Sequence, residues 1–106
     1  MNDMLSMSKS DMTVGAQKAC VMLRALANPS RLMILCYLVE TERTVGEIET
    51  ELKLSQAYVS QQLARLRDER IVTATRDGRM MRYRLSDDRV APLIEVLYDQ
   101  FCREQD

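Results

Sequence analysis

Apolar residues recur at helical spacing through much of the chain. Leu32, Leu35, Cys36 and Val39 fall at i, i+3, i+4 and i+7, a pattern that predicts one buried stripe on a helix. Asn28-Pro29 favours the start of that helix, because asparagine caps free backbone amides and proline is tolerated in the first turn. Cys36 is therefore expected at the core or at its edge.

Two helices joined by a tight turn are expected in the middle of the chain. Thr44 and Glu47 have the spacing of a capping box, which opens a short helix through about residue 52. Ser55 is placed to cap a second helix over residues 55–70. This arrangement predicts a helix-turn-helix.

Helices are also expected near both ends. Residues 11–27 carry apolar positions without an internal proline, which predicts a first helix. Ser86, Asp87 and Asp88 suit the capped, negatively charged start of a last helix. Residues 1–10 show no such pattern and are expected to form a flexible tail, with residues 11–106 as a single domain.

The pattern changes to alternation after Ile71. Asp77-Gly78 lies between two β-favouring runs, which predicts a hairpin because this turn requires positive φ. The second strand is expected to place Met81, Tyr83 and Leu85 on one side and Arg82 and Arg84 on the other. The predicted fold class is mainly α with a small β-hairpin: a winged helix-turn-helix of five helices and a two-stranded wing.

Charge is distributed unevenly along the 106 residues, whose net charge is −1. Residues 53–84 hold eight basic and three acidic side chains, a net charge of +5, so the rest of the chain carries −6. A basic helix-turn-helix and wing indicate DNA binding, and an arginine-rich wing argues against a protein-docking role. The outward face of the second helix is expected to contact base edges, and the wing arginines phosphate or the minor groove. The candidate DNA-binding residues are Ser55, Gln56, Tyr58, Ser60, Gln61, Gln62, Arg65, Arg76, Arg79 and Arg82.

Composition disfavours an enzyme. The chain has no histidine, so it lacks the usual general base and the commonest transition-metal ligand. It has no glycine-rich phosphate motif, and its three cysteines show no CxxC spacing, so neither a cofactor nor a metal is expected. No stretch has the length of a membrane span or the pattern of a signal peptide, which favours a cytoplasmic protein with reduced thiols.

Taken in order, these motifs resemble the ArsR/SmtB family of small winged-helix repressors. The matching segments are ALANPSRLMIL, VGEIETEL, LSQAYVSQQLARLRDERIV and RDGRMMRYRL. The resemblance implies a homodimer that pairs through its first and last helices and binds double-stranded operator DNA. Gln62 stands where relatives often have histidine, which leaves the operator sequence open. The cysteine motif and the histidines of the family's metal sensors are absent, so metal sensing is disfavoured, and an arsenic site built from the thiols is a minor alternative.

Within this family, ILCYL and DQFCRE resemble the dithiol subgroup typified by BigR, SqrR and HlyU. The resemblance implies that Cys36 and Cys102 are sensing thiols, that persulfides or other reactive sulfur link them through a polysulfide bridge, and that the bridged dimer leaves its operator. Cys102, near the end of its helix, is expected to be more accessible than Cys36. Cys20 is expected to be a packing or interface residue.

Other functions stay open. The same thiols could sense peroxide through a simple disulfide, which requires Cα atoms within about 7 Å. The chain could regulate virulence genes as an HlyU-like protein, or its thiols could be purely structural, since free cysteine packs as a small hydrophobe. A thiol enzyme such as a sulfur transferase is disfavoured by the lack of CxxC and of a nearby base.

Overall fold

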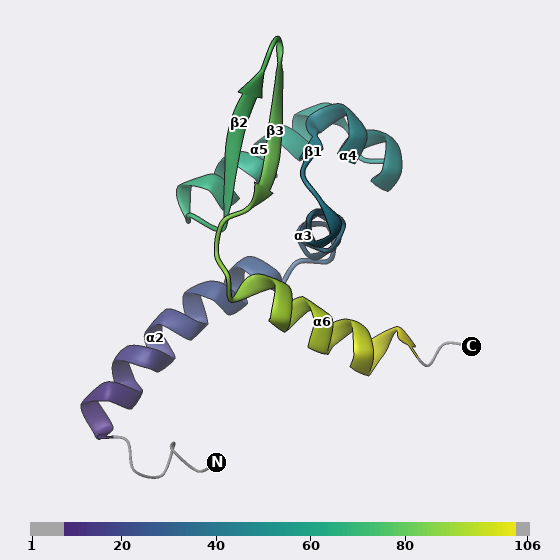
Figure 1. Cartoon of the computed structure of the whole chain (residues 1–106). Coiled ribbons are helices and arrows are strands. Elements are labelled where there is room, and N and C mark those ends of the chain that lie inside the picture. The colour runs from purple at the N-terminus through teal and green to yellow at the C-terminus, as the bar shows by residue number, and fades with distance from the viewer. Residues whose placement is uncertain (1–7, 104–106) are drawn as a thin grey trace.

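Five helices and a three-stranded antiparallel sheet make up the part of the chain that the computed structural model describes, residues 8–103. The elements are, in order, α2 (Lys9–Leu26), α3 (Pro29–Glu40), β1 (Arg43–Thr44), α4 (Val45–Leu52), α5 (Gln56–Asp68), β2 (Val72–Asp77), β3 (Met80–Leu85) and α6 (Val90–Phe101). Figure 1 shows the hairpin of β2 and β3 on one side of α3 and the long helices α2 and α6 on the other. The predicted winged helix-turn-helix is confirmed.

Local hydrogen bonds build the helix-turn-helix. The Thr44 hydroxyl accepts from the Glu47 N–H at 3.1 Å while the Glu47 carboxylate accepts from the Thr44 N–H at 2.9 Å, so the predicted capping box is present. Helix α4 ends at Lys53, whose φ of 57° lies in the left-handed region and turns the chain. Ser55 caps α5 by accepting from the Tyr58 N–H at 3.2 Å.

Helix α3 starts as predicted but buries a different stripe. The Asn28 side chain accepts from the Arg31 N–H at 3.0 Å, which caps the helix before Pro29. The buried residues are Ile34, Leu35 and Leu38. Cys36 is exposed, so of the two predicted locations, the core and its edge, the core is wrong. The reason is that α3 touches neighbours on several sides, and spacing alone did not say which side faces the main core.

The sheet contains one strand more than the sequence predicted. Strands β2 and β3 pair from Val72 with Leu85 to Asp77 with Met80, and Gly78 makes the turn with a φ of 65°. Strand β1 pairs antiparallel with β3 and gives the order β1-β3-β2, so the two-stranded wing was incomplete. A strand of two residues is too short to show the alternation from which strands are predicted.

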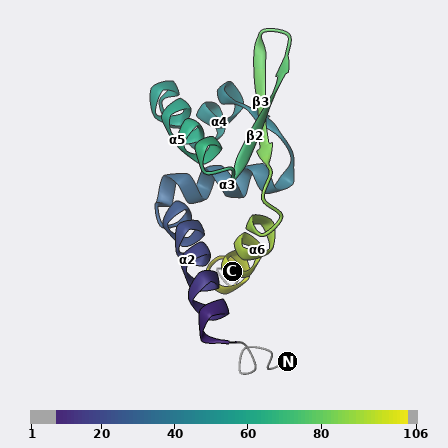
Figure 2. The same cartoon turned by 90° about the vertical axis from the view of Figure 1, so that its left-hand side faces the viewer.

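Helices α2 and α6, the two arms of the molecule, extend away from the helix-turn-helix, and Figure 2 shows them from a second side. Helix α2 begins at Lys9, two residues before the predicted start, because the Ser8 hydroxyl accepts from the Asp11 N–H at 3.2 Å. The rest of the predicted tail, residues 1–7, lies outside the described residues, as do residues 104–106. Within residues 8–103 no single helix is long and apolar enough to cross a membrane, and α2 and α3 pass that test only together, with a 96° bend between them.

The predicted cap of α6 is wrong. The helix begins at Val90 with Arg89 as its N-cap residue and no side-chain cap. The Asp87 carboxylate instead binds the Arg89 guanidinium at 2.7 Å, and the Ser86 hydroxyl donates to the Arg70 carbonyl at 2.9 Å. The Asp87 carboxylate also accepts from the Arg89 N–H at 2.9 Å, so these two side chains fix the connection from the wing to the start of α6 without capping the helix.

Candidate functional site

The outer face of α5 carries most of the polar side chains selected from the sequence. Gln56, Ser60, Gln61 and Arg65 are exposed on this helix. Tyr58 is half-buried, and its hydroxyl donates to the Asn28 side chain at 3.5 Å, which ties α5 to the start of α3. The exposed side chains form a surface able to hydrogen-bond with base edges, while Ser55 already uses its hydroxyl as the helix cap.

Gln62 does not belong to this face. Its side chain is only 8% exposed, and its Oε1 has no hydrogen-bond partner among the described residues. It follows Val59 by three positions and precedes Leu66 by four, and both of these residues are buried, so helical spacing places it on the inner side. The prediction of an outward Gln62 is wrong because it rested on the polarity of the amide rather than on its position.

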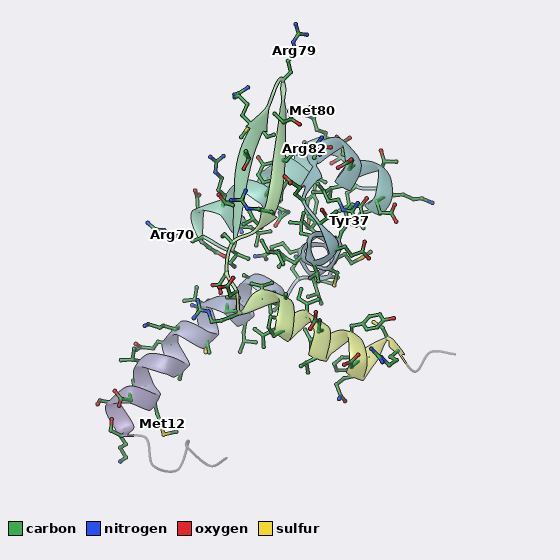
Figure 3. The ribbon with its side chains drawn as sticks, in the orientation of Figure 1. Met12, Tyr37, Arg70, Arg79, Met80 and Arg82 are labelled. Carbon is green, nitrogen blue, oxygen red and sulfur yellow. The ribbon has the colours of Figure 1, made fainter. Side chains whose placement is uncertain are left out.

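The arginines of the wing differ in their exposure and in their contacts. Arg76 and Arg79 are exposed, and Figure 3 shows Arg79 at the tip of the hairpin. Arg82 is half-buried, and its Nε donates to the Asp77 carboxylate at 3.0 Å, which holds the pKa of Arg82 above its usual value. The tip arginines are therefore available to an approaching phosphate, whereas Arg82 lies along the strand.

Arg70 is a basic side chain that the sequence analysis did not select. It is exposed at the end of α5, in the left-handed region with a φ of 63°, and Figure 3 labels it. Its side chain extends the basic surface of α5 and the wing. The charge count over residues 53–84 contained it, but helical spacing gave no sign that it would face outward.

Helices α3 and α6 form the walls of a cavity of about 490 Å³ that contains the Cys36 side chain. The lining residues are Cys36, Val39, Glu40, Ile94, Glu95, Tyr98, Asp99 and Arg103. Cys102 ends α6, and its N–H donates to the Tyr98 carbonyl at 2.9 Å. Cys102 does not line the cavity itself, but Arg103, the next residue, does.

The two thiols influence each other electrostatically. The pKa of Cys36 is raised above its usual value, mainly by burial between the helices and then by the nearby charge of the Cys102 thiolate. Both thiols are nevertheless exposed, so the predicted difference in their accessibility is not resolved. A raised pKa leaves less thiolate at neutral pH, which slows attack by Cys36 on an electrophilic sulfur.

Charged groups surround the thiol cavity, and the sequence analysis did not select them. Arg103 pairs with Asp99 at 2.8 Å, and Glu40 pairs with Arg43 at 2.9 Å. Throughout residues 8–103, no group of three or more cysteine, aspartate or glutamate side chains could hold a metal ion.

Cys20 lies apart from this cavity. It is exposed on α2 and lines a different hollow with Thr13, Gln17 and Arg24. Its surroundings come from α2 alone, so the described structure brings no second thiol to it.

Comparison with known proteins places these features among bacterial regulators. The sequence profile described as "Bacterial regulatory protein, arsR family" matches residues 28–74. The biofilm growth-associated repressor of Agrobacterium fabrum is 42% identical over 91 residues, which cover 86% of this chain and 78% of the repressor. The transcriptional activator HlyU of Vibrio cholerae is 39% identical over 97 residues, covering 92% and 90% of the two chains.

Solved structures of similar proteins share the fold. The transcriptional repressor BigR from Xylella fastidiosa superimposes with a TM-score of 0.83 at 40% identity, over 91% of this chain and 98% of that one. Reduced HlyU from Vibrio cholerae N16961 gives a TM-score of 0.83 at 40% identity, over 88% and 98% of the two chains. The likeness therefore extends over the arms as well as the helix-turn-helix.

Proposed function

The chain belongs to the bacterial ArsR family of regulatory proteins, and on this premise we propose that it is a dithiol-based transcriptional repressor. It is a DNA-binding regulator and not an enzyme. In the proposal, the reduced protein binds operator DNA in the cytoplasm. It is released when reactive sulfur joins Cys36 to Cys102.

The observation that carries this proposal is the placement of the two thiols. They are 66 positions apart in the 106-residue sequence, yet the cavity that Cys36 lines is also lined by Asp99 and Arg103, which flank Cys102 in sequence. A covalent bridge between them would join α3 to the end of α6. Because α3 contacts both α4 and β3, a change in its position would reach the DNA-binding elements.

The DNA-binding part of the proposal rests on the exposed residues of α5 and the wing. Gln56, Ser60, Gln61 and Arg65 would read bases, while Arg76, Arg79 and the newly found Arg70 would contact phosphates or the minor groove. A homodimer would carry two such surfaces and engage half-sites roughly 34–36 Å apart. Exposed apolar side chains on α2 and α6, such as Leu23 and Val96, would form its interface.

The bridging chemistry balances without a further oxidant. A cysteine thiolate attacks the outer sulfur of a persulfide R–S–SH, the S–S bond breaks, and R–S⁻ takes a proton and leaves as a thiol. The second cysteine reacts in the same way. One protein persulfide then attacks the cysteine sulfur of the other, HS⁻ leaves with the electron pair and takes a proton, and a trisulfide remains. Sulfane sulfur is thus the oxidant: of the two sulfur atoms delivered, one stays in the middle of the bridge and the other leaves as hydrogen sulfide.

Release of DNA requires that the bridge favour one of two conformations. To change occupancy from 99:1 to 1:99, the two conformations must differ in bridging free energy by about 5.5 kcal/mol. A covalent bond that is compatible with only one arrangement of α3 and α6 can supply a difference of this size. The released state would hold the two α5 helices out of step with successive major grooves.

Three alternatives share the same fold. A disulfide formed by peroxide would make the protein a redox sensor, and the similarity to HlyU favours a regulator of virulence genes. With purely structural thiols, the chain would bind DNA regardless of thiol chemistry.

The test compares cysteine variants of the full chain. An operator-containing duplex is first selected from a random library with the reduced wild-type protein. DNA affinity is then measured for wild type, Cys36→Ser, Cys102→Ser and the matched control Cys20→Ser, before and after glutathione persulfide, hydrogen peroxide or glutathione disulfide. Intact mass and peptide mapping identify any bridge.

We expect wild type and Cys20→Ser to gain a bridge containing extra sulfur in persulfide alone and to release DNA. Cys36→Ser and Cys102→Ser should bind DNA with the same affinity before and after persulfide treatment. A plain disulfide in peroxide would favour the redox alternative. DNA release by persulfide-treated Cys36→Ser would contradict the dithiol mechanism.

A further inference from the structure

Strand β1 connects the thiol helix to the wing. It follows α3 after two residues, and its residues Arg43 and Thr44 pair with Tyr83 and Arg82 of β3. Thr44 also caps α4. Figure 1 shows β1 between α3 and the hairpin, so a shift of this short strand would reach both the wing and the first helix of the helix-turn-helix.

The Arg43 side chain is fastened to the last turn of α3 by three contacts. Its Nη2 lies 2.9 Å from Glu40 Oε1, its Nε donates to the Tyr37 carbonyl at 3.4 Å, and its guanidinium carbon lies 3.8 Å from the centre of the Tyr37 ring. The arginine side chain is 19% exposed, whereas that of Glu40 is 75% exposed. The stack on Tyr37 is therefore shielded from water and contributes more than the exposed ion pair.

The same turn of α3 borders the thiol cavity. Glu40 lines that cavity together with Cys36, one helical turn earlier, and Tyr37 follows Cys36 directly. Both anchors of Arg43 therefore lie within four residues of the thiol that the bridge would pull toward α6. Figure 3 labels Tyr37 at α3 and Arg82 on the wing strand with which β1 pairs.

We propose that Arg43 is a positioning residue that transmits the state of the Cys36–Cys102 pair from α3 through β1 to the wing. The proposal rests on the dithiol function above and names the element by which the bridge changes DNA affinity. Movement of the Tyr37–Glu40 turn shifts the guanidinium, the backbone of Arg43 carries the shift to its partner Tyr83, and the hairpin changes its angle to α5.

The measured quantity is the ratio of the DNA dissociation constants of the bridged and reduced forms. A residue that only stabilises the fold changes both constants by the same factor and leaves this ratio alone. A residue that couples the two sites changes the ratio. Each sample is checked by intact mass for the bridge and by circular dichroism for folding.

Arg43→Met keeps the length of the side chain but removes its charge and the stack on Tyr37. We expect its ratio to fall about tenfold from the wild-type value, within the usual range for coupled sites. Arg43→Lys keeps the charge and should give an intermediate ratio. The matched control is Arg24→Met, which removes an exposed arginine from the last turn of α2, away from β1 and from the connection between the wing and α6, and its ratio should equal that of wild type.

A wild-type ratio in Arg43→Met and Arg43→Lys would overturn the proposal while leaving the dithiol function in place. If the wild-type protein itself forms no bridge, the dithiol function fails and this proposal fails with it. Should Arg43→Met not fold, Tyr37→Leu provides the same comparison, because it removes the ring on which the guanidinium stacks and keeps an apolar side chain. A reduced ratio in Tyr37→Leu supports the proposal and an unchanged one contradicts it.

Discussion

The helix-turn-helix and the two arms differ in how completely they bury their apolar side chains. In the helix-turn-helix, Ile48, Val59, Leu63 and Leu66 are all 0% exposed. In the arms α2 and α6, apolar side chains remain open to solvent, including Leu23 at 55% and Val96 at 57%. The helix-turn-helix completes its core within a single chain. The arms leave exposed apolar surface that a second surface would have to cover.

The largest effect is expected from a charge placed on the arms. Val96→Glu should prevent dimer formation and lower operator affinity about a hundredfold or more, because the two recognition helices no longer bind as a linked pair. Sedimentation and DNA titration measure the two consequences. Met33→Glu is the matched control, since Met33 is 52% exposed but lies on α3. A dimeric Val96→Glu protein with wild-type affinity would contradict the interpretation of the arms.

The outer face of α5 should matter for recognition but not for folding. Gln61→Ala should weaken binding to the selected duplex by about 1–3 kcal/mol, with little change in the free energy of unfolding. Competition with random-sequence DNA would show whether the loss is specific. An equal loss on both kinds of DNA would assign Gln61 to backbone contacts instead.

The alkylation rate of Cys36 should depend on pH, and this dependence should differ between the folded and the unfolded protein. Its raised pKa means that less thiolate is present at a given pH near neutrality, so iodoacetamide should alkylate Cys36 more slowly in the folded protein than in urea. Below the pKa, the rate should rise roughly tenfold per pH unit. Besides Cys102, the charged groups at the cavity are Glu40, Glu95, Asp99 and Arg103.

Removing Cys102 sharpens this measurement. Because its thiolate charge contributes to the raised pKa, Cys102→Ser should move the pH profile of Cys36 part of the way back toward that of the unfolded chain. An identical profile in wild type and Cys102→Ser would show that the two thiols do not interact.

The smallest effect is expected inside α5. Gln62→Leu removes a buried oxygen that has no partner among the described residues, so the free energy of unfolding should rise by about 1 kcal/mol or stay unchanged. Thermal or urea denaturation measures it. A loss of more than about 2 kcal/mol would mean that the amide makes a hydrogen bond essential to the helix.

The same division explains what the sequence could predict. The Thr44 capping box, the Ser55 cap and the Gly78 turn depend on atoms only a few residues apart, and all three are present as expected. Gln62 was placed on the wrong side, and Cys36 could not be assigned to the core or to its edge, because burial depends on which distant element packs against each side of the helix. The cap expected from Ser86, Asp87 and Asp88 was wrong because the Asp87 carboxylate binds the side chain and the N–H of Arg89, the residue before the helix.

The surroundings of the two thiols could be predicted from the sequence only in part. Resemblance to the dithiol subgroup selected Cys36 and Cys102, but the carboxylates around them come from two helices and have no common spacing in the sequence. The contacts of Arg43 could not be predicted either, because they require both the end of α3 and a two-residue strand that the sequence pattern did not reveal.

The recognition helix is bracketed by Lys53 and Arg70, both in the left-handed region with φ of 57° and 63°. For side chains with a Cβ, this conformation costs roughly 1–2 kcal/mol per residue, and glycine would relieve it. Glycine would also remove a positive charge from each end of the helix. In the proposed DNA complex, glycine at these two positions would therefore raise the thermal stability of the protein but weaken its contacts with the phosphate backbone.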